Sequence, residues 1–137
     1  MLKYESKPVL LKENCETVYN FISDLTNFNR LIKDYEINDW KADSNYCEFR
    51  VNNFGKIALK ISESQPYEYI KYTTTEESFI NFNIRISLNN TPEKRAESKL
   101  YLEADVPFFL QPLVKNHLQK IIDIITKAME NFNFKSQ

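Results

Sequence analysis

Between positions 46 and 104, apolar residues recur at every second position in several separate runs. In "YCEFRV", Cys47, Phe49 and Val51 alternate with polar or charged residues. The same period returns in "KIALKIS", "YIKYTTT", "INFNIRISL" and residues 95–104. A period of two places successive side chains on opposite faces of a strand. Each run therefore predicts a strand with one buried face, here called dry, and one solvent-exposed face, here called wet. The short turn segments between the runs, such as "NNFG" at 52–55 and "NNTPEK", predict hairpins and therefore an antiparallel sheet.

The segment ahead of this sheet predicts a strand and two short helices. Residues 2–12 have the composition of a strand, and Pro8 within it indicates an edge position or a bulge. Asn14 is suited to cap a helix that follows it. Apolar residues at helical spacing in 15–25 and again in 28–32 predict two helices, each with one face on a core.

A long helix is predicted at the C-terminal end, from about Gln111 or Pro112 to about Phe132. At about 100° per residue its apolar side chains fall within an arc of about 180°, which is too wide to be exposed and predicts that the helix lies on the sheet. His117, the one histidine of the chain, projects into this arc between Leu113 and Ile121, so we expect it to face inward. The arc comprises Leu113, Val114, Leu118, Ile121, Ile122, Ile124, Ile125, Ala128, Met129 and Phe132.

A hydrophobic loop, "VPFFLQP", precedes this helix. Pro107 and Pro112 stiffen its two ends, and Phe108, Phe109 and Leu110 lie between them. Burying each of these three side chains contributes on the order of 1.5–3 kcal/mol, so we expect them to be shielded from water. One interpretation is a plug that closes an end of the sheet–helix layer. The other is a gate that admits apolar cargo, or an apolar contact surface for a partner or a membrane.

Composition and charge exclude several classes of function. A chain of 137 residues predicts a single domain over 1–137. One glycine, Gly55, leaves no room for a glycine-dependent phosphate loop. A net charge of -1 without a basic run argues against nucleic acid as a partner. The start "MLKYESKPVLLKEN" lacks the continuous apolar core of a secretion signal, and no stretch has membrane-spanning length. We therefore expect a cytoplasmic protein without an integral membrane segment.

The reactive residue types are few and scattered. Cys15 and Cys47 lie far apart without a partner motif, so we expect reduced, partly buried thiols. One histidine and two cysteines do not supply the three or four ligands of a zinc site, so no metal is expected. Neither a GxSxG nor an HExxH motif occurs, and no motif indicates a cofactor. The carboxylates at Glu103 and Asp105 fall on the wet face and predict a solvated set of ion pairs.

The order of these elements resembles the Bet v 1-like, START-related superfamily, also called SRPBCC. Three local patterns carry the resemblance: "NCETVYNFISDLTNFNRL", "ESQPYEYIKY" and "VPFFLQPLVKNHLQKII". It spans nearly the whole chain and implies an α+β helix-grip fold, in which a curved antiparallel sheet of about seven strands wraps around the C-terminal helix. It also implies a cavity between the two. Members include lipid carriers, polyketide cyclases and chaperone activators, so the resemblance leaves the cargo open.

From the pattern and the resemblance we expect a noncatalytic module for a small hydrophobic molecule that is lipid-like, aromatic or isoprenoid. One alternative is a protein-interaction module, resembling chaperone activators or ribosome-associated members, with a partner at the Phe108–Phe109 loop. The other is a cyclase- or dehydratase-like enzyme with His117 as general base. Two interpretations of His117 stay open: a neutral histidine with a purely structural role, and a residue that contacts the ligand. Trp40 likewise suits either core packing or stacking on a ligand. The predicted ligand-binding residues are Trp40, Phe49, Tyr72, Phe82, Leu100, Phe108, Phe109, Leu113, His117 and Ile121.

Overall fold

The computed structural model describes residues 1–32, 37–51 and 55–135. Within these ranges one antiparallel sheet holds eight strands, in the order β1-β8-β7-β6-β5-β4-β3, and β2 also pairs with β8. The strands are β1 (Leu2–Glu5), β2 (Val9–Leu10), β3 (Ile37–Ala42), β4 (Tyr46–Val51), β5 (Gly55–Gln65), β6 (Tyr69–Thr74), β7 (Phe82–Asn90) and β8 (Ala96–Ala104). The antiparallel sheet predicted from the sequence is thereby confirmed. The predicted turn at 52–55 lies, except for Gly55, outside the described residues.

The opening segment forms two strands instead of one. Pro8 lies between β1 and β2, and both strands pair with β8. Proline has no N–H to donate to a ladder, so it interrupts the pairing at the point where it occurs. The predicted edge position is confirmed, because β1 ends the strand order.

Two α-helices and a 3-10 turn precede β3, and a second 3-10 turn leads into the long last helix. The Asn14 side-chain oxygen accepts a hydrogen bond from the Thr17 backbone N–H at 2.9 Å, which confirms the predicted cap. The elements are α1 (Cys15–Ile22), η1 (Leu25–Asn27), α2 (Phe28–Leu31), η2 (Phe108–Leu110) and α3 (Gln111–Asn131).

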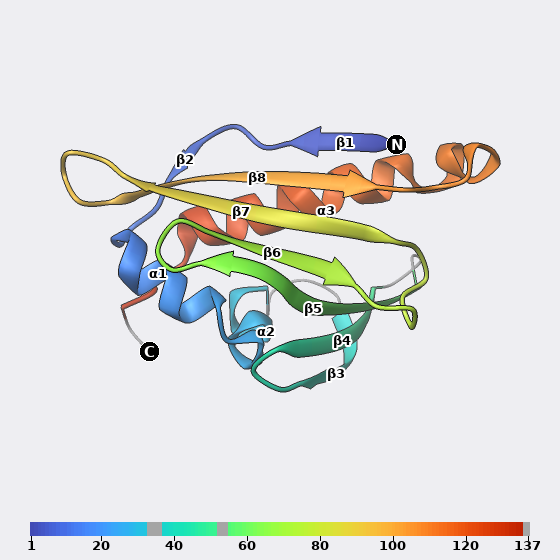
Figure 1. The fold of residues 1–137 in the computed structure, drawn as a ribbon, viewed down its shortest axis with the longest axis horizontal. Helices are drawn as coiled ribbons and strands as arrows, with labels where there is room; N and C mark the ends of the chain where they lie inside the picture. The colour runs from blue at the N-terminus through green and yellow to red at the C-terminus, as the bar shows by residue number, and fades with distance from the viewer. Residues whose placement is uncertain (33–36, 52–54, 136–137) are drawn as a thin grey trace.

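The long helix α3 lies along one face of the sheet, as Figure 1 shows, and is in contact with β8, β1, β2 and α2. Two hydrogen bonds join the helix to β1 and to the segment between β2 and α1. The Tyr4 hydroxyl donates to the Lys115 carbonyl at 3.2 Å, and the Lys12 ammonium donates to the Asn131 carbonyl at 3.0 Å. The latter bond satisfies one of the carbonyls that a helix leaves unpaired at its C-terminal end. The sheet-and-helix arrangement expected for a helix-grip fold is confirmed.

The core lies between the inner face of the sheet and the helices. In β8 the side chains alternate as predicted, and those at Ala96, Ser98, Leu100, Leu102 and Ala104 are buried. Both cysteines are free and are fully buried, not partly. Burial raises the pKa of the Cys15 thiol, and it raises that of Cys47 to about 12, so both thiols stay protonated and unreactive near neutral pH.

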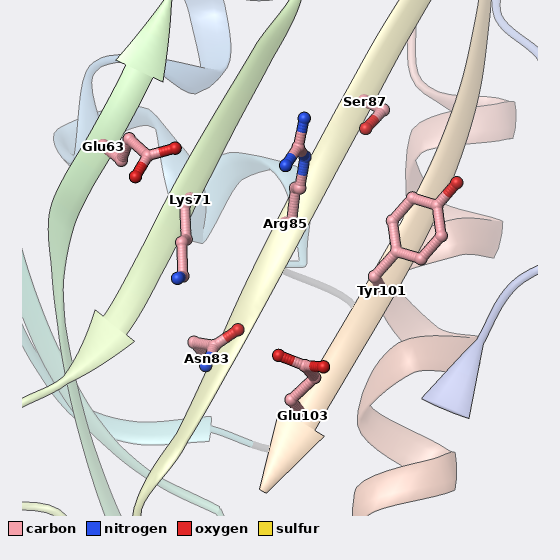
Figure 2. Close-up of a pocket in the computed structure, with 7 residues that line it drawn as sticks. All are labelled: Glu63, Lys71, Asn83, Arg85, Ser87, Tyr101 and Glu103. Atoms are coloured by element: carbon pink, nitrogen blue, oxygen red, sulfur yellow. The ribbon is translucent and has the colours of Figure 1, made fainter. Parts of the chain in front are cut away.

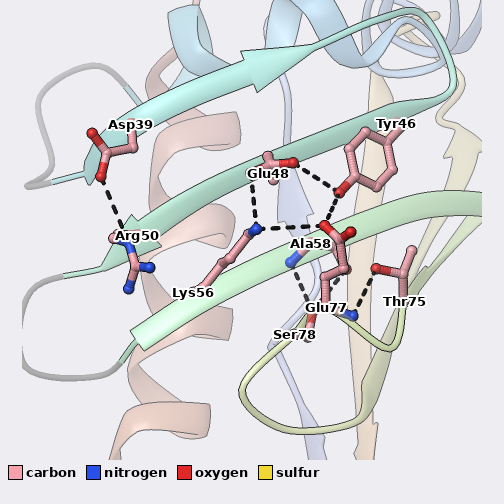
Figure 3. A network of polar contacts seen from close by, with 9 residues as sticks. All are labelled: Asp39, Tyr46, Glu48, Arg50, Lys56, Ala58, Thr75, Glu77 and Ser78. Atoms are coloured by element: carbon pink, nitrogen blue, oxygen red, sulfur yellow. Dashed lines mark hydrogen bonds and ion pairs between the residues drawn. The ribbon is translucent and has the colours of Figure 1, made fainter.

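One residue on the predicted wet face is buried. Ala58 alternates with the dry positions of its strand, yet it is 0% exposed. The segment that follows β6 folds back over it, as Figure 3 shows. Thr75 donates its N–H to the Ala58 carbonyl at 2.9 Å, and the Ser78 hydroxyl oxygen accepts from the Ala58 N–H at 2.7 Å. Strand periodicity does not reveal such a loop, because the loop covers the strand from outside the sheet.

Candidate functional site

Three large apolar side chains are exposed where α3 begins, and we call them the apolar end. Phe108 is 86% exposed, Phe109 77% and Leu113 70%. The plug interpretation is therefore wrong for both phenylalanines, and the predicted packing of Leu113 on the sheet is wrong. The reason is position: η2 lies beyond the end of β8, past the edge of the sheet (Figure 1). Leu110, by contrast, is half-buried and packs against the core.

The turn that presents the apolar end is well bonded. Pro107 has an extended backbone, with φ -51 and ψ 139, which turns the chain into η2. The Leu110 N–H donates to the Pro107 carbonyl at 2.9 Å, and the Gln111 side-chain amide donates to the Val106 carbonyl at 3.2 Å. Val106 itself is buried. The two phenylalanines are thus held outward on a defined turn.

The apolar arc of α3 divides into two stripes. One packs in the core and comprises Val114, Leu118, Ile122, Ile125 and Met129. The other is only partly covered and comprises His117, Ile121 and Ile124, continuing from Leu113; we call these three the half-buried stripe. At about 100° per residue, the half-buried stripe lies about 120–180° around the helix from Lys115. The backbone carbonyl of Lys115 bonds to Tyr4 of β1, so this side of the helix faces β1. The half-buried stripe, on the other side of the helix, therefore faces away from β1.

Three rings from different elements form an aromatic group on the inner side of the β3–β4 edge. Phe28 of α2 lies 6.2 Å from Trp40 of β3, and Trp40 lies 5.8 Å from Phe49 of β4, between ring centroids. Phe28 and Phe49 are 6.1 Å apart. Phe49 is buried, whereas Phe28 and Trp40 are half-buried. The group packs on itself and keeps part of its surface open, and α2, which supplies Phe28, contacts α3.

Tyr72, Phe82 and Leu100, which were predicted to line a ligand site, lie in the packed core. Their exposed fractions are 4%, 4% and 0%. The Tyr72 hydroxyl donates to the Ile22 carbonyl at 2.6 Å, and burial raises its pKa above the usual range. This bond ties the end of α1 to β6. Tyr72 therefore already uses its proton in a structural contact, which disfavours it as a catalytic partner for His117.

Two buried hydroxyl groups have no hydrogen-bond partner among the described residues. They belong to Ser98 on the inner face of β8 and to Thr126 on α3. Leaving a buried hydroxyl unpaired costs about 1–3 kcal/mol, so such atoms call for a bound water or a ligand group. Sequence reasoning placed Ser98 on the dry face, and a polar residue at a dry position is the signal that could have marked it. Thr126 fell on the polar half of the predicted helix and carried no such signal.

A polar network on the outer face of β4 and β5 is closed on itself (Figure 3). Lys56 pairs with Glu48 at 3.1 Å and with Glu77 at 3.4 Å, and the Tyr46 hydroxyl bonds both carboxylates at 3.1 and 3.2 Å. The hydrogen bond from Lys56 lowers the pKa of Glu48, whereas burial and the carboxylates raise that of Tyr46. The network borders a surface pocket of about 340 Å³. Because each charge in it is paired, we assign it the structural role of holding down the segment around Glu77.

The described residues hold no group of three or more His, Cys, Asp and Glu side chains arranged to bind a metal ion. Across the same ranges, none of the helices combines the length and the apolar character needed to cross a membrane. The apolar surfaces described above are the apolar end, the half-buried stripe and the aromatic group.

A curved antiparallel sheet with two short helices after its first strands and a long C-terminal helix on one face defines the helix-grip class. The chain has the START-like, Bet v 1-like fold. It matches a START superfamily protein from Mycobacterium smegmatis with a TM-score of 0.70 and 16% identity, over 93% of this chain and 94% of that one. It matches truncated norcoclaurine synthase from Thalictrum flavum with a TM-score of 0.71 and 9% identity, over 94% and 92%.

A third match is the Aha1 dimer from Colwellia psychrerythraea, with a TM-score of 0.65, 15% identity, and coverage of 96% of this chain and 98% of that one. No protein-family model and no curated protein sequence matches the chain. At these identities the structural matches show the fold alone. The resemblance predicted from the sequence is confirmed at that level.

Proposed function

We propose that the protein binds a small hydrophobic molecule, lipid-like, aromatic or isoprenoid, between the inner face of the sheet and α3, without catalysis. The observation that carries the proposal is the apolar end, where Phe108, Phe109 and Leu113 stay exposed beside the half-buried stripe. Apolar surface in water is costly, at about 25 cal/mol per Å². A ligand that enters at this end of α3 would cover it.

The proposed walls of the site are the half-buried stripe on one side and the aromatic group on the other. Entry requires η2 and the first turn of α3 to move, and η2 extends past the end of β8 (Figure 1). Once inside, the ligand gains affinity by burial. His117 is the polar residue within the stripe, so its imidazole is the proposed partner for a ligand carbonyl or hydroxyl.

The one tryptophan, Trp40, provides a test because it lies in the aromatic group. Titration with long-chain fatty acids should shift its emission in a saturable way. Burying about 300 Å² of apolar ligand surface is worth at most about 7–8 kcal/mol, so the dissociation constant should be micromolar or weaker. His117→Gln should weaken binding of a fatty alcohol more than that of an alkane of equal length. Unchanged emission with fatty acids, alcohols and flat aromatic compounds would count against the proposal.

A second candidate function is a protein-interaction module, and the exposure of Phe108 and Phe109 favours it as well. Exposed aromatic side chains are common anchors in protein interfaces, because a partner's pocket can bury them fully. In this alternative the apolar end is covered by a protein and the layer between sheet and helix stays closed. Substitution of Phe108 and Phe109 distinguishes the two candidate functions. A loss of ligand uptake favours the binding of a hydrophobic molecule, and a loss of protein capture favours the interaction module.

A further inference from the structure

The outer face of the sheet, opposite α3, carries a pocket of about 410 Å³. Four neighbouring strands, β5, β6, β7 and β8, contribute to it, and Figure 2 shows their side chains standing on one surface. The lining residues are Glu63, Lys71, Asn83, Arg85, Ser87, Tyr101 and Glu103. This pocket lies on the far side of the sheet from the proposed hydrophobic site, so a ligand bound in it is independent of the proposed function.

Two cations in this pocket are placed directly opposite each other. In the pairing of β6 with β7, Lys71 is the cross-strand partner of Arg85. Like charges in such positions repel each other and destabilise the sheet. Figure 2 shows the two side chains extending in opposite directions along the surface. The guanidinium of Arg85 lies 4.1 Å from the centre of the Tyr69 ring, a contact that uses its face and leaves its N–H edges open.

Neither cation has an ion-pair partner within the described part of the chain, although Glu63 is the cross-strand partner of Lys71 on β5. The ion pairs found there join other residues, and Lys71 and Arg85 take part in none of them. The two carboxylates of the pocket, by contrast, are engaged. Glu103 pairs with Lys3 of β1 at 3.6 Å, and Glu63 accepts a hydrogen bond from the Tyr69 hydroxyl at 2.7 Å. Of the two carboxylates only Glu103 is in an ion pair; the Tyr69 hydroxyl is a neutral donor, so Glu63 keeps its negative charge next to Lys71.

Three neutral donors face the same pocket. The Asn83 amide, the Ser87 hydroxyl and the Tyr101 hydroxyl make no side-chain hydrogen bond to another described residue. They flank Arg85, since Asn83 and Ser87 lie two positions on either side of it in β7 and Tyr101 is its partner on β8. Two cations with a set of amide and hydroxyl donors are the groups that proteins use to bind oxyanions.

We propose that this pocket binds the phosphate group of a small soluble molecule. A dianion that draws the Lys71 ammonium toward the Arg85 guanidinium turns their repulsion into two attractions, and the amide and hydroxyls of the pocket complete its hydrogen bonds. The closed network around Lys56 offers no such site, because each of its charges already has a partner (Figure 3). The pairing of Glu103 with Lys3 limits the repulsion that this carboxylate exerts on the anion.

The test is a titration of isotope-labelled protein with inorganic phosphate near neutral pH, at ionic strength held constant with sodium chloride, followed by backbone amide shifts. We expect saturable shifts at Asn83, Arg85, Ser87 and Tyr101, with a dissociation constant in the millimolar range. The double variant Lys71→Gln/Arg85→Gln should weaken binding at least about tenfold, since it removes two charge-assisted contacts.

The matched control is Lys60→Gln, which removes an exposed outer-face charge of β5 outside the pocket. It should leave the phosphate affinity unchanged. Acetate at equal ionic strength should bind more weakly than phosphate, since it carries one charge. The proposal is overturned by shifts that do not saturate, by equal affinity for acetate, or by a double variant that binds phosphate as well as the parent protein. The far-ultraviolet spectrum of each variant shows that it is folded.

Discussion

Replacing Leu118 by alanine should lower the free energy of unfolding by about 2–5 kcal/mol, as large-to-small changes in a packed core do. Leu118 is 0% exposed and lies in the middle of the stripe that α3 packs against the sheet. Its removal leaves a cavity between the two layers of the molecule. The loss is measured by urea unfolding followed through the emission of Trp40 and the far-ultraviolet signal.

Leu113→Ala is the matched control for this prediction. It makes the same chemical change in the same helix, so the difference in helix propensity is shared by both variants. Because Leu113 is 70% exposed, the change should alter the free energy of unfolding by no more than about 0.5 kcal/mol. Equal losses in the two variants would mean that α3 is rotated about its axis relative to the orientation described above.

The double variant Phe108→Ser/Phe109→Ser should weaken uptake of a hydrophobic ligand at least about tenfold while leaving stability nearly unchanged. The two rings are exposed in the free protein, so their loss removes little packing. If they close over a bound ligand, each contributes burial free energy of about 1.5–3 kcal/mol only in the complex. The readouts are the Trp40 titration with a fatty acid and urea unfolding of the unliganded protein.

Leu10→Ser serves as the comparison, because it removes an exposed apolar side chain from β2 instead of η2. It should leave the ligand affinity unchanged. If the Phe108 and Phe109 double variant binds ligand normally but loses a protein partner that the parent chain retains, the second candidate function is favoured. If both variants weaken ligand binding alike, the apolar end has no special part in it.

The features that could be predicted from the sequence are those set by neighbours along the chain. Alternation in 46–51 and 95–104 determines which side chains share a face, and the structure confirms it. The Asn14 cap depends on one side chain and an N–H three residues later. The long helix begins and ends within one residue of the predicted positions, because its pattern is regular over many turns.

What could not be predicted depends on where one element ends relative to another. Periodicity places Leu113 and Leu118 in one apolar arc but does not say which part of the arc the sheet covers. The exposure of Phe108 follows from the position of η2 beyond the end of β8. The burial of Ala58 follows from a loop folded over its strand.

The outer-face pocket also depends on how one element is placed relative to another. Alternation predicts that Arg85 faces outward, but the opposition of Lys71 and Arg85 is a matter of register between two strands. One residue of slip would separate them. Composition and spacing therefore identify the fold class, whereas the candidate sites arise from register and from the lengths of elements.

The proposed function depends on a hydrophobic molecule being held between the inner face of the sheet and α3. Intermolecular nuclear Overhauser effects from a bound fatty acid test it directly. We expect contacts from the acyl chain to Ile121 and Ile124 of the half-buried stripe and to Trp40 of the aromatic group. Contacts confined to the outer face of the sheet, or to Phe108 and Phe109 with none to these three residues, would contradict it.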